Sequence, residues 1–306
     1  MPGRRRHSGW TPPAGAPYIL AAMARRDFLK MQGLGNDFVV VDARPRLFAA
    51  DAPLSRALAD RRTGIGCDQL IVVERPRKPG ADVFMRILNA DGSEVDACGN
   101  ATRCIARWLY LEEGLARPTI ETNAGLLVTK VRDGGEAVAV DMGLAADDWR
   151  AIPLSREADT LHLPLVRGPL SDPVGVSVGN PHAVFFVPDP EAIALAELGP
   201  AIEHDALFPQ RTNVEVVGVE SPSRLRLRVW ERGAGITRAC GTGACAAVVA
   251  AHRRGLAGRS VVVELDGGEL AIDWRVDGHV VMTGPAAISF TGSFDEEAWR
   301  RAAARG

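Results

Sequence analysis

Cysteine is scarce in this chain, and its scarcity argues against several kinds of protein. The 306 residues include five cysteines, an odd number. None of them forms a C-x-x-C pair or a cluster with the spacing of a zinc site, so no metal centre is predicted. These features argue against a disulfide scaffold and predict a reducing compartment, the cytoplasm. The free thiols are therefore either core residues or catalytic groups.

Long apolar runs and excess charge are also missing. No apolar run reaches the roughly 18 residues that a membrane-spanning helix needs. A formal net charge of -2 gives no electrostatic argument for binding nucleic acid or a membrane surface. With 46% hydrophobic and 24% charged residues, the composition is that of a globular protein, long enough for one large domain or two.

The first 26 residues differ from the rest of the chain. They contain five arginines, no acidic residue and a Pro- and Gly-rich centre. Such a composition occurs in transit peptides. We favour instead a disordered extension over residues 1–26, or a true start at Met23.

One segment of the chain occurs twice. Arg228–Ala246 aligns with Arg86–Cys104 without a gap at a shift of 142 residues, which places Cys240 over Cys98. Each copy has the pattern of a short apolar strand, a glycine-rich loop, a cysteine and a helix. The repeat therefore predicts two thiols at two related helix starts.

The repeat extends beyond the cysteine unit and predicts the fold. Four positions are doubled in the same order, namely Asn36/Asn180, Gln69/Asn213, Asn89/Glu231 and Cys98/Cys240. We expect an α+β protein of two similar pseudo-symmetric domains, each a mixed sheet or barrel wrapped around a central helix, with the site in the cleft between them. The predicted N-terminal domain is residues 27–147, with 285–306 as a candidate segment to complete it, and the predicted C-terminal domain is residues 148–284.

Helix signals support this arrangement. A helix is predicted over residues 100–113 and should end at Gly114. The helix over residues 241–254 has almost no polar face, so it should be buried on every side. Shorter helices are expected at 53–61, with Asp51 as the N-cap, and at 294–305.

Two thiols at helix starts can perform acid–base chemistry. Unpaired N–H groups and the helix dipole should lower the pKa of each thiol, and the same N–H groups can bind a carboxylate. One carbon held between the sulfurs could lose a proton to one and gain a proton from the other, as in a racemase or epimerase. Cys67, Cys104 and Cys245 have no such context and are predicted to be core residues.

The motifs GLGNDFVVVD, GIGCDQLIVVE, NADGSEVDACGNATRC, GNPHAVFF, TNVEVV and ERGAGITRACGTGACA resemble those of the diaminopimelate epimerases, in order, over about residues 27–284. The resemblance implies a homodimeric, cofactor-independent epimerase that interconverts LL- and meso-diaminopimelate for lysine and peptidoglycan synthesis. Catalysis would fall to Cys98 and Cys240, with His182 supporting them. The implied substrate-binding residues are Asn36, Gln69, Asn89, Gly99, Asn100, Asn180, Asn213, Glu231, Arg232, Gly241 and Thr242.

Three alternatives compete with this interpretation. Epimerases of the proline racemase type also use two thiols, but they usually follow the first cysteine with Gly-His, whereas this chain has Gly99-Asn100. A thiol redox or cysteine-nucleophile enzyme would need a resolving cysteine or a Cys–His–acid set. A non-catalytic amino acid binding protein would be expected to have lost one thiol.

Overall fold

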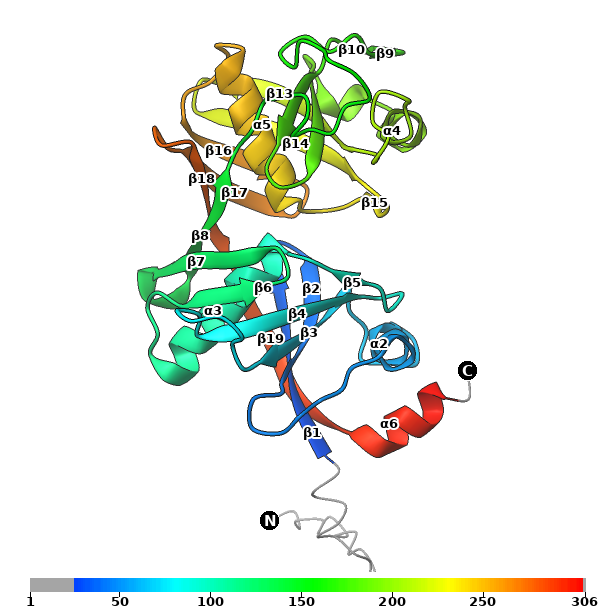
Figure 1. Cartoon of the computed structure of the whole chain (residues 1–306), viewed down its shortest axis with the longest axis vertical. Helices are drawn as coiled ribbons and strands as arrows, with labels where there is room; N and C mark the ends of the chain where they lie inside the picture. Colours follow the sequence, from blue (N-terminus) through cyan, green and yellow to red (C-terminus); the bar gives the residue numbers. More distant parts are fainter. Residues whose placement is uncertain (1–24, 305–306) are drawn as a thin grey trace, which may run out of the picture.

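The computed structural model describes residues 25–304 and shows two lobes stacked along the long axis of the molecule (Figure 1). Each lobe contains a mixed sheet and a long helix, so the predicted α+β fold of two similar domains is confirmed. None of the helices within residues 25–304 is both long and apolar enough to cross a membrane.

The first domain is built from the elements of the N-terminal half. They are β1 (Arg25–Gly33), β2 (Asn36–Asp42), α2 (Ala52–Ala59), β3 (Gln69–Glu74), β4 (Val83–Asn89), β5 (Glu94–Val95), α3 (Gly99–Glu113), β6 (Thr119–Thr122), β7 (Gly125–Arg132), η1 (Asp133–Gly135) and β8 (Ala137–Leu144).

The second half repeats this order and then returns to the first domain. Its elements are β9 (Val166–Arg167), β10 (Leu170–Ser171), β11 (Val174–Ser177), β12 (Pro181–Phe186), η2 (Pro190–Ala192), α4 (Leu195–Glu203), β13 (Asn213–Ser221), β14 (Arg224–Glu231), β15 (Gly235–Ile236), α5 (Gly241–Arg253), β16 (Ser260–Leu265), β17 (Gly268–Trp274), β18 (His279–Pro285), β19 (Ala287–Asp295) and α6 (Glu296–Ala303).

The strand pairings show that the repeat in the sequence is a repeat in the fold. In the first half, β1–β2 is antiparallel, β2–β3 parallel, β3–β4 antiparallel and β4–β6 parallel. The pairs β11–β12, β12–β13, β13–β14 and β14–β16 have the same directions. The register also matches. Phe38 pairs with Gln69, and the residues 144 positions later, His182 and Asn213, pair with each other.

The helix of each domain is central, as the apolar pattern predicts. Every residue of α5 from Gly243 to Ala251 is buried, and the helix contacts strands β11 to β14 and β16 to β18. Helix α3 ends at Gly114, whose φ of 73° is the left-handed conformation that glycine favours at a helix end. Burial of these two helices under the surrounding strands forms the main hydrophobic core.

The chain crosses between the domains at two neighbouring places. Strand β8 pairs with β18, which joins the sheets of the two halves, and the next strand, β19, pairs with β1 of the first domain. Arg25 and Arg26 already form antiparallel pairs with Asp295 and Phe294. The predicted extension over residues 1–26 therefore ends two residues too late, and its residues 1–24 lie outside the described residues.

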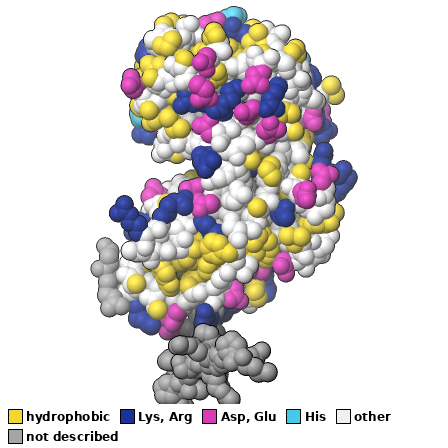
Figure 2. All heavy atoms as spheres, turned by 180° about the vertical axis from the view of Figure 1, so that it is seen from behind, with side chains coloured by type: hydrophobic (Ala, Val, Ile, Leu, Met, Phe, Trp, Pro, Cys, Tyr) yellow, Lys and Arg dark blue, Asp and Glu magenta, His cyan; other side chains and the backbone are white. Residues whose placement is uncertain are grey.

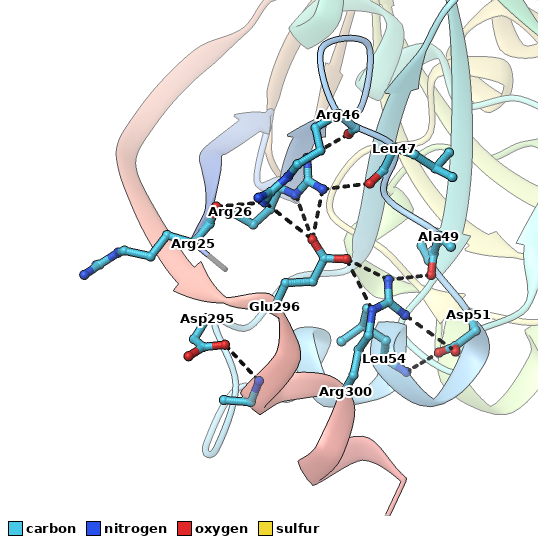
Figure 3. Close-up of polar contacts among 12 residues, drawn as sticks. Arg25, Arg26, Arg46, Leu47, Ala49, Asp51, Leu54, Asp295, Glu296 and Arg300 are labelled. Carbon is cyan, nitrogen blue, oxygen red and sulfur yellow. Dashed lines mark hydrogen bonds and ion pairs between the residues drawn. The ribbon is translucent and has the colours of Figure 1, made fainter. Parts of the chain in front are cut away.

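The C-terminal helix α6 is held against the first domain by charged side chains (Figure 3). Glu296 accepts hydrogen bonds from Arg26 at 2.9 Å and from Arg300 at 3.0 Å. Burial alone would raise the pKa of Glu296, but these two guanidinium groups hold it below its ordinary value. Arg26 also donates to the carbonyls of Arg46 and Leu47, so this one side chain joins β1, the loop between β2 and α2, and α6.

Replacing Glu296 with alanine should lower the free energy of unfolding by about 2 kcal/mol, because Arg26, only 5% exposed, would lose its charged partner. The pKa of Glu296 is depressed, so its contribution is present above the pKa of an unfolded glutamate and is lost as the pH falls. Urea unfolding at neutral and acidic pH measures both effects. Glu297→Ala is the matched control, since Glu297 is 73% exposed; an equal loss in the two variants would contradict the prediction.

Candidate active site

Each of the two predicted catalytic cysteines is the residue that precedes a central helix. Cys98 is the N-cap of α3 and Cys240 is the N-cap of α5, both in extended backbone conformation. The sulfur of Cys240 accepts a hydrogen bond from the N–H of Gly243 at 3.3 Å. Cys98 is partly exposed, whereas Cys240 is buried. All five cysteines are free thiols.

The two helix starts meet at Met282 of β18. A Cβ atom on Gly99 would lie 2.9 Å from the Cε atom of Met282, and one on Gly241 would lie 2.8 Å from its sulfur. A side chain at either position would require the end of the flexible Met282 side chain to shift, so both helix starts pack closely against the same residue. Asn100 crosses between the domains and donates to the carbonyl of Ala239 at 3.1 Å. The surface is hollowed between the two lobes in the view from behind (Figure 2).

The Cys98 side of the site is organised around Asn36. Its amide nitrogen donates to Asp68 at 2.9 Å, and its amide oxygen accepts from Asn100 at 3.2 Å. Because the nitrogen faces a carboxylate, the oxygen must face Asn100 and the Cys98 sulfur, which lies 3.9 Å away. Arg61 holds Asp68 in turn at 2.6 Å.

The Cys240 side has a different set of contacts. The Thr242 hydroxyl lies 3.5 Å from the Cys240 sulfur and accepts from the amide nitrogen of Asn180 at 3.3 Å. The oxygen of Asn180 lies 2.8 Å from Nε2 of His182, and Nδ1 of that ring lies 2.7 Å from the carboxylate of Glu215. His182 is thus connected to the thiol through two intervening residues.

The remaining predicted residues lie at strand ends and contact one another within each half. Gln69 donates to Asn89 at 2.9 Å. In the second half, Asn213 accepts from the backbone N–H of Arg232 at 2.9 Å, and Thr237 donates to Glu231. Within residues 25–304, these side-chain contacts of Gln69, Asn89 and Asn213 do not reach either sulfur.

The helix starts act on the thiols as predicted, but the expected net lowering of the two thiol pKa values is wrong for this structure. Burial and the charge of Glu231 raise the pKa of Cys98 to about 11, against N–H groups of α3 that lower it. Burial, Glu231 and Glu215 raise the pKa of Cys240 well above its ordinary value. The sequence pattern identified the helix ends but not the desolvation that outweighs them.

Four further residues of the site were not predicted. Met282, Asp68 and Glu215 contact site residues from strands or loops, and none of them belongs to a doubled position. Arg103 on α3 is fully buried, and one of its guanidinium nitrogens has no hydrogen-bond partner among the described residues. Asp68, Arg103 and Glu215 stand inside the motifs GIGCDQLIVVE, NADGSEVDACGNATRC and TNVEVV, so the sequence could have indicated these three, whereas Met282 lies outside the motifs.

Comparison with known proteins identifies the family. The model of the family described as diaminopimelate epimerase matches residues 28–146 and 174–289. The chain belongs to the diaminopimelate epimerase family. A diaminopimelate epimerase of Rhodospirillum centenum is 59% identical over 274 residues, covering 90% of this chain and 94% of the relative. One from Phenylobacterium zucineum is 56% identical over 277 residues, covering 89% and 99%.

Solved structures resemble this member of the diaminopimelate epimerase family at the level of the fold. A hydroxyproline epimerase from Agrobacterium vitis superposes with a TM-score of 0.63 at 16% identity, covering 89% of this chain and 92% of its own. A phenazine biosynthesis protein of the PhzF family from Bacillus anthracis has a TM-score of 0.64 at 17% identity, covering 88% and 99%. The two-domain fold is therefore shared by proteins with other names.

The raised pKa values predict the pH dependence of thiol modification. Only the thiolate reacts with iodoacetamide, so the rate at Cys98 should rise about tenfold per pH unit above neutrality and level off only near a pH of about 11. Mass spectrometry of the alkylated peptides at several pH values gives this rate. A rate that is already constant above a pH of about 8 would show that the helix N–H groups outweigh burial after all.

Proposed function

We propose that this protein interconverts LL- and meso-diaminopimelate by two-base proton transfer between Cys98 and Cys240. The observation that carries the proposal is the meeting of two equivalent cysteine-capped helices from opposite domains at one methionine. Inverting a carbon requires an acid and a base on opposite faces, and the pseudo-symmetry of the fold supplies similar groups on two sides. Membership of the family supports the choice of substrate.

The reaction is balanced by the two sulfurs and the substrate carboxylate. One thiolate takes the proton of the α-carbon as the C–H bond breaks, and the electron pair moves into the carboxylate. The opposite S–H then donates its proton to the other face of the carbon. The first-turn N–H groups of any α-helix lack a partner within the helix, so Gly99-Asn100 and Gly241-Thr242 can hold the carboxylate as its charge grows.

The polar residues around the thiols suit a substrate with two amino acid ends. Glu231 can accept from an ammonium group, and the side chain of Arg232 can pair with a carboxylate. Burial raises the pKa of Glu231, which a bound ammonium group would oppose. The amides of Asn36, Gln69, Asn89, Asn180 and Asn213 can bind groups of either charge.

A proline-racemase-type activity is the second candidate, favoured by the same fold. A probable proline racemase from Agrobacterium radiobacter has a TM-score of 0.64 at 17% identity, covering 87% of this chain and 92% of its own. At this identity the likeness reflects the fold alone. The Asn100 side chain after Cys98-Gly99 and the Glu231-Arg232 pair favour diaminopimelate. Turnover of proline without turnover of diaminopimelate would reverse this choice.

Exchange with D2O tests the two-base mechanism. Wild type should incorporate deuterium at the α-carbon of diaminopimelate, while Cys98→Ala and Cys240→Ala should each lose at least about a hundredfold in epimerisation rate. Cys104→Ala and Cys245→Ala are matched controls, since both thiols are buried in the same helices with pKa values raised to about 12 by burial. Wild-type epimerisation by either N-cap variant would refute the mechanism.

We also propose that the protein is a homodimer. The proposal is supported by the family resemblance and by apolar side chains that stay exposed on strand β7, namely Leu126 and Val128. Light scattering of the purified protein should give twice the mass of the 32.7 kDa chain. A single species at the mass of one chain would contradict it.

A further inference from the structure

A buried histidine–glutamate pair behind Cys240 is not explained by the proposed reaction. His182 on β12 and Glu215 on β13 both have side chains with 0% exposure, and their nearest atoms are 2.7 Å apart. The second oxygen of Glu215 has no hydrogen-bond partner among the described residues. Burying such a pair costs more free energy than packing apolar residues of similar size. Its presence therefore indicates a role other than stabilising the fold.

The first domain serves as an internal control for this pair. At a shift of 144 residues, His182 corresponds to Phe38 and Glu215 to Ile71. The strands have the same register in both halves, since Val40 pairs with Ile71 and Val184 pairs with Glu215. Phe38 and Ile71 are fully buried and apolar. The fold itself therefore does not require charged residues at these positions.

The helix start next to the pair differs between the halves in a matching way. Gly243 of α5 corresponds to Ala101 of α3 at a shift of 142 residues. A Cβ atom on Gly243 would lie 3.0 Å from Oε1 of Glu215 and 3.2 Å from the Cys240 sulfur. The carboxylate thus lies directly against the position where the first domain has an alanine methyl group, at a point adjacent to the Cys240 sulfur.

A series of hydrogen bonds connects the pair to the Cys240 thiol. Nε2 of His182 faces the oxygen of Asn180, so the ring donates there, and the nitrogen of Asn180 then donates to the hydroxyl of Thr242. Because the hydroxyl oxygen accepts from Asn180, its own proton is available to the sulfur 3.5 Å away. The equivalent amide, Asn36, presents its oxygen to Cys98 instead.

We propose that Glu215 is a positioning residue for the reaction, because it holds the His182 ring with an N–H directed toward Asn180. The series of hydrogen bonds then continues through Asn180 to Thr242, whose hydroxyl proton is directed at the Cys240 sulfur. The proposal rests on the proposed function of Cys240 as an acid–base group. A hydrogen bond from Thr242 stabilises the thiolate form of Cys240, as does the N–H of Gly243.

Three ionisable side chains near Cys240 determine how the test is designed. Glu231 lies on β14, Glu215 on β13 and His182 on β12. Removing Glu215 alone would change both the local charge and the hydrogen-bond chain. Removing His182 and Glu215 together leaves Glu231 in place. Because the Glu215 carboxylate raises the pKa of Cys240, its loss alone would speed alkylation of Cys240, whereas loss of the hydrogen bonds through Asn180 and Thr242 would slow it. The direction of the change therefore separates the two effects.

The test gives the second domain the residues of the first, in the variant His182→Phe/Glu215→Ile. Its melting temperature should equal or exceed that of wild type, because apolar residues replace a buried polar pair. The rate of alkylation of Cys240 relative to Cys98 should fall about tenfold at fixed pH, and kcat should fall at least as much with a smaller change in KM. Glu215→Gln should keep most of the wild-type ratio, because the amide oxygen or N–H can still pair with Nδ1 and hold the ring in place.

Each other outcome is informative. A lower melting temperature in the double variant would mean that the pair holds the fold, and would overturn the proposal. So would an unchanged alkylation ratio, or a Glu215→Gln variant as impaired as the double variant. Alkylation and melting do not depend on the substrate, so they still test the positioning role if diaminopimelate is not turned over.

Discussion

The close approach of two helix starts is the constraint on which the rest of this structure depends. Gly99 and Gly241 come from different domains, yet a Cβ atom on either would collide with the same methionine, Met282. The surrounding elements hold these two helix starts in place. The strands bury each helix on several sides and fix its direction, the cysteines cap the ends, and Asn100 bridges from one domain to the other. A catalytic centre that must reach both faces of one carbon needs such an arrangement.

Sequence alone predicted the architecture because the same elements and the same polar residues recur in the same order in both halves of the chain. The doubled motifs indicated the order of elements, and the helix end at Gly114 and the N-cap role of Asp51 followed from local capping rules. The thiol pKa values were mispredicted because the effect of a helix end is local in the sequence. Desolvation depends instead on segments that are distant in the sequence and pack around the thiols in the fold. The contacts of Glu215 and Met282 could not be predicted for the same reason: they are made across strands, and a repeat reveals only what both halves share.

The two halves of the site have diverged where chemistry requires a difference. Asn36 is locked by Asp68 and Arg61, with its oxygen toward Cys98, while the contacts of Asn180 run from a buried histidine toward Cys240. The charged surroundings differ as well. Burial raises the pKa of both thiols. At Cys98 Glu231 adds to that rise and Arg103 opposes it, whereas at Cys240 both Glu231 and Glu215 add to it. A pseudo-symmetric scaffold thus holds an asymmetric pair of thiols, as a reaction that begins with one base and one acid demands.

The pairing of β19 with β1 has a consequence for how the protein is made. Strand β1 is the first described strand to leave the ribosome, and its partner on one side is among the last, with Arg25 opposite Asp295. The first domain therefore cannot complete its sheet until nearly the whole chain has been synthesised, although the second domain has all its own strands earlier. Until then β1 has an unpaired edge, which is the kind of surface that associates with other chains. The N-terminal domain is in this sense the last to finish folding, and nascent chains should depend most on protection during the synthesis of the second half.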